Sequence, residues 1–139
     1  MDRLTANYQA ISQIAFDEHY AVPLDQKAPL LFSEFPSTVD DGANLVDAMA
    51  TAYLIALLES ICTRELRGFI DPGSETVTGV VVECRHRAPV AKGGLLRVSG
   101  WVEGIAENEV SFRVQVQDEQ EQVCDASIRL AILPRARIA

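Results

Sequence analysis

The sequence predicts an α+β fold in which an antiparallel β-sheet wraps around one long central helix. Residues 44–66 form a long apolar segment without Gly or Pro, which is typical of a buried helix. Four strand-like segments follow it, at residues 76–87, 95–105, 109–118 and 122–133, and turn residues separate them. One further strand-like segment, 14–22, precedes the helix.

The central helical segment is apolar on nearly all sides, so we expect other protein to surround it. The strands that follow alternate between apolar and polar residues, as Val110, Phe112, Val114 and Val116 show. Short turns between such strands predict an antiparallel meander, and its apolar face needs the helix as a cover. This arrangement is the hot-dog fold, although the pattern also suits other α+β folds.

The 139 residues suit a single domain, 1–139, with one hydrophobic core. Residues 1–13 are expected to form an N-terminal extension, with a short helix over 4–14. Residues 23–44 carry Pro, Asp and Gly among scattered apolar residues, and we interpret them as a long covering loop.

Composition narrows the class of protein. Hydrophobic residues make up 48% of the chain, which excludes disordered and collagen-like chains. The net charge of −8 repels phosphate backbones and anionic lipid, so we expect neither nucleic acid nor a membrane as partner. The longest apolar run, Ala52–Leu58, is too short for a transmembrane helix. The chain also lacks the common hydrolase, nucleotide-binding and zinc-protease motifs.

The cysteines and histidines indicate the compartment and argue against a metal. Cys62, Cys84 and Cys124 are odd in number and lie beside apolar neighbours, which favours buried free thiols in a reducing cytoplasm. The first residues lack the pattern of a signal peptide. With two histidines and no paired cysteine motif, we expect no metal site, and we expect no cofactor.

Three polar residues stand in apolar surroundings. Glu59 interrupts the apolar helix, and His86 falls on the same side of its strand as Val80, Val82 and Cys84. If both side chains are buried, each needs a hydrogen-bond partner, and they can provide it by contacting each other directly or through a shared water. Such a pair is suited to general-base catalysis. Thr51 lies eight residues before Glu59 and shares its helix face only loosely. The alternatives are a solvated Glu59 at a rim, a structural His86 in the core, and a Thr51 that caps the helix.

A basic segment follows the histidine strand. Residues 85–97 carry Arg85, Arg87, Lys92 and Arg97 and no acid, in a chain that is otherwise acidic. Such a segment is either a solvated sheet edge or a binding site for a phosphate group, such as one on coenzyme A.

The sequence resembles the fluoroacetyl-CoA thioesterase family of hot-dog proteins over about residues 45–133. The segments MATAYLIALLESIC, TVTGVVVECRHRAPVAKGG and ASIRLAIL carry the resemblance. It implies an active site of Thr51, Glu59 and His86, and a backbone amide of Gly79 near the thioester carbonyl. It also implies that Arg129 lies near the active site, although strand alternation places this arginine on the polar side. Hot-dog proteins pair their sheets, so the resemblance further implies a homodimer that can assemble into a dimer of dimers.

The resemblance departs from the family in one place. The family's phenylalanine-bearing lid is not matched in position, because the similar segment Phe32–Pro36 lies too far upstream of Thr51. We therefore expect a thioesterase that hydrolyses a small or medium acyl-CoA rather than one specific for fluoroacetyl-CoA. The alternatives are a non-catalytic acyl-CoA binding protein and a hot-dog hydratase or dehydratase.

Overall fold

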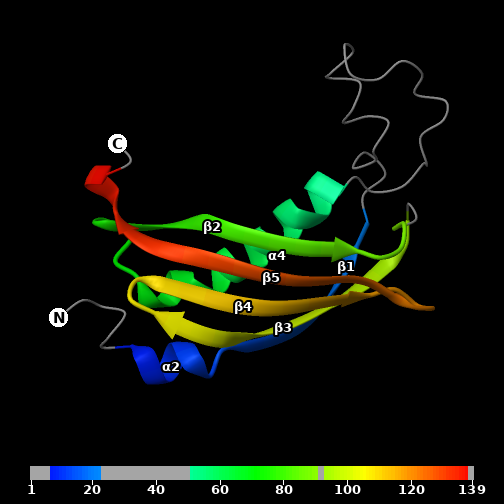
Figure 1. Ribbon diagram of the computed structural model, residues 1–139, viewed down its shortest axis with the longest axis horizontal. Coiled ribbons are helices and arrows are strands. Elements are labelled where there is room, and N and C mark those ends of the chain that lie inside the picture. Colours follow the sequence, from blue (N-terminus) through cyan, green and yellow to red (C-terminus); the bar gives the residue numbers. More distant parts are fainter. Residues whose placement is uncertain (1–6, 23–50, 91–92, 138–139) are drawn as a thin grey trace, which may run out of the picture.

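The computed structural model describes residues 7–22, 51–90 and 93–137 (Figure 1). The predicted covering loop and the first residues of the predicted central helix lie outside the described residues. The elements in chain order are α2 (Tyr8–Ser12), β1 (Ala15–Ala21), α4 (Thr51–Leu66), the short 3₁₀ helix η2 (Arg67–Phe69), β2 (Glu75–His86), β3 (Leu95–Ala106), β4 (Glu109–Gln117), β5 (Gln122–Pro134) and the 3₁₀ helix η3 (Arg135–Arg137). The α+β prediction is confirmed.

The five strands form one antiparallel sheet in the order β1-β3-β4-β5-β2, and α4 lies against one face of it (Figure 1). The predicted meander is correct for β3, β4 and β5, but wrong for β2, which pairs with β5 and not with β3. The link from His86 to Leu95 is long enough to cross the end of the sheet, because three strand spacings amount to only about 14 Å. As a result, β2 is an edge strand.

The hydrophobic core lies between α4 and the sheet. The helix contributes Leu54, Leu58, Ile61 and Cys62, whose spacing of three to four residues places them on one face. Phe112, Val114, Ile128 and Leu130 meet them from the sheet, and Ile11 of α2 is also fully buried in the core. The opposite face of α4 is not enclosed by the described part of this chain, since Ala52 and Ala56 are exposed. The described part of one chain therefore covers only one face of the helix.

A bulge in β2 alters the predicted alternation of its side chains. The register with β5 shifts between Gly79 and Val81, so Val80 has no partner in the ladder. Val80 was expected on the inward face with Val82, yet it is 47% exposed. After the bulge the predicted alternation holds, because Val82, Cys84 and His86 are half-buried between exposed neighbours.

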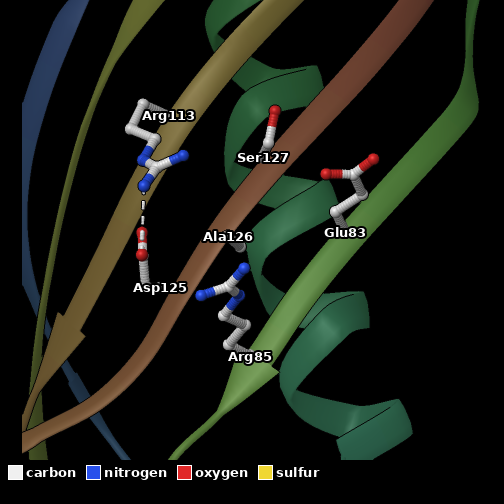
Figure 2. A pocket seen from close by; sticks show the side chains of 6 residues that line it. All are labelled: Glu83, Arg85, Arg113, Asp125, Ala126 and Ser127. Atoms are coloured by element: carbon white, nitrogen blue, oxygen red, sulfur yellow. Dashed lines mark hydrogen bonds and ion pairs between the residues drawn. The ribbon is translucent and has the colours of Figure 1, made fainter.

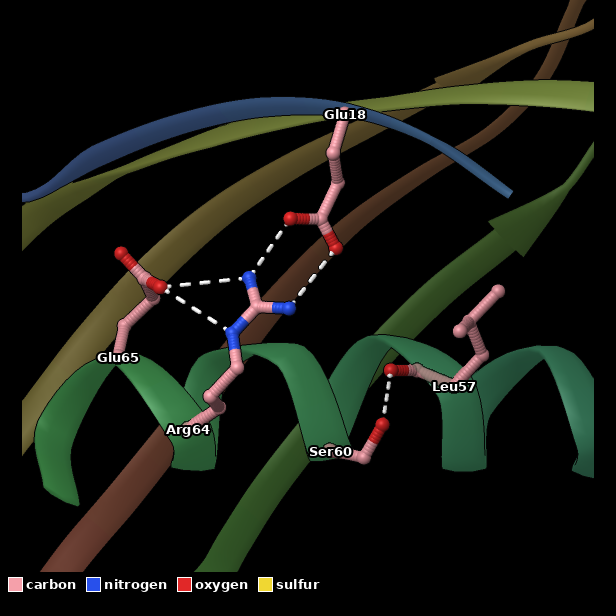
Figure 3. Close-up of polar contacts among 5 residues, drawn as sticks. All are labelled: Glu18, Leu57, Ser60, Arg64 and Glu65. Carbon is pink, nitrogen blue, oxygen red and sulfur yellow. Dashed lines mark hydrogen bonds and ion pairs between the residues drawn. The ribbon is translucent and has the colours of Figure 1, made fainter.

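A polar network on the outside of α4 connects the helix to β1, at the sheet edge opposite β2. The Arg64 guanidinium donates two hydrogen bonds to the Glu18 carboxylate, at 2.7 and 3.2 Å, and it also contacts Glu65 (Figure 3). These contacts raise the pKa of Arg64. Nearby, the Ser60 hydroxyl donates to the Leu57 carbonyl within the helix. Because these ionic side chains are substantially exposed, the pair contributes at most about 1 kcal/mol, and it mainly orients α4 on the sheet.

Candidate active site

The structure brings Thr51 and His86 into direct contact. Thr51 lies on α4, His86 is the last residue of β2, and the Thr51 Oγ1 atom is 2.9 Å from His86 Nδ1. Their separation of 35 residues in sequence means that only the packing of α4 on β2 creates this pair. A hydroxyl at hydrogen-bond distance from an imidazole is the geometry in which the ring can accept the hydroxyl proton during a reaction.

Burial keeps His86 neutral near pH 7. Desolvation lowers the pKa of His86 from its ordinary value of 6.5, and interaction with the Ala88 backbone acts in the opposite direction. The second ring nitrogen, Nε2, is buried and has no hydrogen-bond partner among the described residues. The ring is therefore an uncharged base at physiological pH, with one nitrogen on Thr51 and one nitrogen free.

Glu59 lies against Gly79. A Cβ atom placed on Gly79 would be 2.5 Å from Glu59 Oε1 and 3.1 Å from Glu59 Cδ, so only a glycine lets the carboxylate lie this close to the strand. Glu59 is half-buried, and it forms no hydrogen bond or ion pair with the residues that the structure describes. Gly79, which the resemblance implies lies near the thioester carbonyl, is thus in close contact with the Glu59 carboxylate, a contact that the sequence analysis did not predict.

Within one chain these two pairs lie at different places along the α4–β2 groove. Gly79 and His86 are seven strand residues apart, which corresponds to roughly 20 Å between their Cα atoms. Thr51 and Glu59 are eight helical residues apart, about 12 Å along the helix axis. Direct contact between Glu59 and His86, which we expected, therefore does not form within a single chain.

The thiols beside the site are poorly suited to act as nucleophiles. Cys124 is the cross-strand partner of His86, and the Sγ atoms of Cys84 and Cys124 are 3.2 Å apart. Burial, followed by the hydrogen bond with Cys84, raises the pKa of Cys124, and burial raises the pKa of Cys62 to about 12. Because the thiolate is the reactive form, these two cysteines are inert at neutral pH. All three cysteines are free thiols as predicted, but only Cys62 and Cys124 are buried, and Cys84 is half-buried.

The predicted arginines lie on the other face of the sheet. Arg85 lines a depression of about 150 Å³ together with Glu83, Arg113 and Asp125, on the face away from α4 (Figure 2). Arg87 is 3.9 Å from the same Asp125 carboxylate. Arg129 is also exposed there, 3.7 Å from Glu109. Strand alternation places these three side chains opposite His86, so none of them contacts the Thr51–His86 pair.

Two further features concern possible metal ligands and membrane-spanning helices among the described residues. No group of three or more His, Cys, Asp or Glu side chains is placed to hold a metal ion within the described ranges 7–22, 51–90 and 93–137. In the same part of the chain, no helix has the length and apolar character that crossing a bilayer requires.

Comparison with known proteins gives the family. The sequence profile of the family described as fluoroacetyl-CoA-specific thioesterase matches residues 34–136, which is most of the chain. The chain belongs to this family. The fluoroacetyl-CoA thioesterase of Streptantibioticus cattleyicolor is 21% identical over 118 residues, which cover 85% of this chain and 81% of that protein.

Solved structures confirm the hot-dog fold. A variant of the fluoroacetyl-CoA-specific thioesterase in complex with fluoroacetate and CoA aligns with a TM-score of 0.81 at 20% identity, covering 91% of this chain and 98% of that one. A thioesterase superfamily member from Thermus thermophilus aligns with a TM-score of 0.72 at 21% identity, covering 91% and 86%. A hot-dog-like protein from Thermanaerovibrio acidaminovorans gives 0.75 at 14% identity, covering 95% and 90%.

Sequence reasoning missed a second polar region of the groove. Arg67 and Arg135 line a pocket of about 250 Å³ with Thr63 and Thr76 beyond the Glu59–Gly79 pair. Arg67 follows α4 and lies eight residues after Glu59, a spacing of two helical turns. This spacing places Arg67 near the same face of the helix as Glu59, and it could have indicated that the groove continues there. Arg135 follows the last strand, and only the pairing of β5 with β2 brings it to this place.

Proposed function

We propose that this protein is a cytoplasmic thioesterase that hydrolyses the thioester of a small or medium acyl-CoA, with Thr51, Glu59 and His86 as its catalytic residues. Family membership supports the reaction class. The single observation that carries the site is the 2.9 Å contact of the Thr51 hydroxyl with a histidine kept neutral by burial. A neutral imidazole can accept a proton from the hydroxyl or from a water beside it, whereas an imidazolium cannot.

The active site is completed by a second copy of the chain. The edge strand β2 has no partner on its outer side within the described sheet, and it exposes Val80 and Val81, at 47% and 38%. Exposed apolar residues on an unpaired edge favour pairing with another strand. Antiparallel pairing of β2 with β2 about a two-fold axis between Val82 and Glu83 would place Gly79 of one protomer opposite His86 of its partner.

The helices fit the same axis. The midpoint between Thr51 and Glu59 on α4 is Ile55, and the midpoint between His86 and Gly79 on β2 falls between Val82 and Glu83. Because Thr51 contacts His86 and Glu59 contacts Gly79, these two midpoints face each other in the groove. One two-fold axis therefore brings the Thr51–His86 pair of each protomer towards the Glu59–Gly79 pair of the partner. It would also cover Ala52 and Ala56, which are exposed on the free face of α4.

This composite site assigns a task to each residue. His86 accepts the proton of the nucleophile, which is either the Thr51 hydroxyl or a water held by it. The partner subunit's Glu59 orients that water and favours the protonated imidazole that forms. The backbone amide of the partner subunit's Gly79 stabilises the oxyanion at the thioester carbonyl. The proton then passes to the CoA thiolate as it leaves, which gives the free acid when water attacks and an acyl ester on Thr51 when its hydroxyl attacks. In the second case His86 takes a proton from a water that attacks the ester and returns it to the Thr51 oxygen, so the acid is released and Thr51 is restored. A burst of thiol followed by slower turnover, abolished in Thr51→Val, would show an acyl-enzyme on Thr51.

A thiol-release assay over a panel of acyl-CoAs of increasing chain length tests the function. Glu59→Gln and His86→Ala should each lower kcat/KM by at least about a hundredfold while the far-ultraviolet circular dichroism stays unchanged. Near-normal rates in either folded variant would contradict the mechanism. Saturable CoA binding without thiol release would instead identify a binding protein, and loss of enoyl absorbance would identify a hydratase.

A further inference from the structure

We propose that Arg67 and Arg135 form a binding site for a phosphate group of the CoA portion of the substrate. This inference rests on the proposed thioesterase function and names a part of the substrate site that differs from the basic segment around Arg85 and Arg87. The site is the pocket of about 250 Å³ at the end of the α4–β2 groove.

The pocket lining is cationic and rich in hydrogen-bond donors, in a chain of net charge −8. Two arginines and two threonines line it beside three apolar residues, and no acid is among the residues that line it. The lining residues are Thr63, Arg67, Ile70, Pro72, Thr76, Val77 and Arg135. Guanidinium forks and hydroxyls are the donors that proteins use to hold phosphate oxygens.

The two arginines are available for a ligand. Arg67 is exposed and forms no ion pair or hydrogen bond with any described residue. Arg135 donates from Nε to the Pro72 carbonyl at 2.7 Å, and its backbone amide donates to the Ser74 carbonyl. These two bonds orient the guanidinium while they leave its terminal nitrogens free of described partners.

The acids nearest the pocket are occupied in the adjacent turn. One Asp71 carboxylate oxygen accepts the Gly73 amide and the other accepts the Ser74 hydroxyl. Glu75 accepts the Asp71 amide at 2.8 Å. The turn thereby holds its negative charge in its own hydrogen bonds, and neither carboxylate is part of the pocket lining.

The pocket lies at a suitable distance from the proposed thioester position. Thr63 and Arg67 follow Glu59 by one and two helical turns, and Val77 and Thr76 precede Gly79 by two and three strand residues. The offset is about 10 Å along β2, which lies within the reach of a pantetheine arm. Arg85 and Arg87, in contrast, project from the opposite face of the sheet.

The decisive test compares two substrates for one double variant. Wild-type protein, Arg67→Ala/Arg135→Ala and the control Arg64→Ala/Arg113→Ala are assayed with an acyl-CoA and with the matching acyl-N-acetylcysteamine thioester, which lacks every phosphate. The control removes the same charge from arginines that pair with Glu18 and Asp125 instead. We expect the pocket variant to raise KM for acyl-CoA by about ten- to a hundredfold, with kcat and the truncated substrate unaffected.

The comparison of the two substrates distinguishes a phosphate-binding role of the two arginines from a structural one. Unchanged KM for acyl-CoA in the pocket variant, or an equal loss with both substrates, would overturn the assignment, because a structural role affects both substrates alike. An equal KM rise in the control would also overturn it, since that would reflect net charge alone. If wild-type protein hydrolyses neither substrate, the thioesterase proposal itself is wrong. With 3′-dephospho-CoA thioesters, loss of the KM defect assigns the pocket to the 3′-phosphate, and persistence assigns it to the diphosphate.

Discussion

Gly79→Ala should damage catalysis far more than stability. An alanine Cβ at this position would lie 2.5 Å from Glu59 Oε1, whereas an ordinary contact begins at 3.4 Å, so the carboxylate must retreat by about 0.9 Å. A displacement of about 1 Å in a catalytic group can cost about a hundredfold in rate. The stability change should stay within about 1 kcal/mol, because the Glu59 side chain can move and alanine is favoured over glycine in a strand by about 0.5–1 kcal/mol.

The assay is acyl-CoA hydrolysis with kcat and KM determined separately, together with thermal unfolding. Gly104→Ala is the matched control, since a Cβ at that strand glycine meets no atom within 4 Å. We expect kcat to fall by about a hundredfold in Gly79→Ala and to remain unchanged in Gly104→Ala. A normal kcat in a folded Gly79→Ala protein would refute the argument that the position of the Glu59 carboxylate matters. Adding Gly79→Ala to Glu59→Gln should cause little further loss.

Three other substitutions or conditions test separate parts of the account. Thr51→Val should lower kcat by about a hundredfold and Thr51→Ser should retain most activity, because only the hydroxyl contacts His86; equal rates in the two variants would remove Thr51 from the chemistry. Burial lowers the pKa of His86 below 6.5, so its contribution to stability is fully present above pH 6.5 and is lost as the pH falls through the folded-state pKa. Because the partner subunit's Glu59 favours the protonated ring, the acid limb of kcat/KM is measured on the residual activity of Glu59→Gln, where it should lie below pH 6.5; a limb above pH 6.5 in that variant would contradict a buried neutral base. Gly100→Ala should destabilise the fold by about 1–3 kcal/mol in denaturant unfolding, because its Cβ would meet Phe16 and the Arg113 carbonyl oxygen at 2.5 and 2.7 Å; an unchanged midpoint would show that β1 and β3 repack freely.

The strands were predictable from the sequence because hydrophobic alternation survives in each of them. Every predicted strand lies within about two residues of its observed bounds. The pairing of β2 with β5 was not predictable, since it depends on where the link after His86 leads and not on any local pattern. The outward turn of Val80 was missed for a similar reason, because a bulge shifts the alternation without a distinctive residue to mark it.

The candidate site was only partly predictable. The family resemblance identified Thr51 and His86 as site residues, and the inward side of His86 followed from strand alternation, but the direct contact of Thr51 with His86 was not expected. The expected meeting of Glu59 with His86 does not occur within one chain because Thr51 is the helix residue that lies at His86, and Glu59 lies about 12 Å further along the helix axis. Arg129 illustrates the opposite case, since simple alternation placed it on the outer face where the structure has it.

The central claim, that two chains share each active site, can be tested by mixing two inactive proteins. Glu59→Gln and His86→Ala protomers, co-expressed with different tags, form mixed dimers in which one site retains both wild-type residues. A composite site predicts recovery of about a quarter of wild-type thioesterase activity from random pairing, concentrated in the doubly tagged fraction. Activity no higher than that of either variant alone, in mixed dimers verified by both tags, would contradict the shared site.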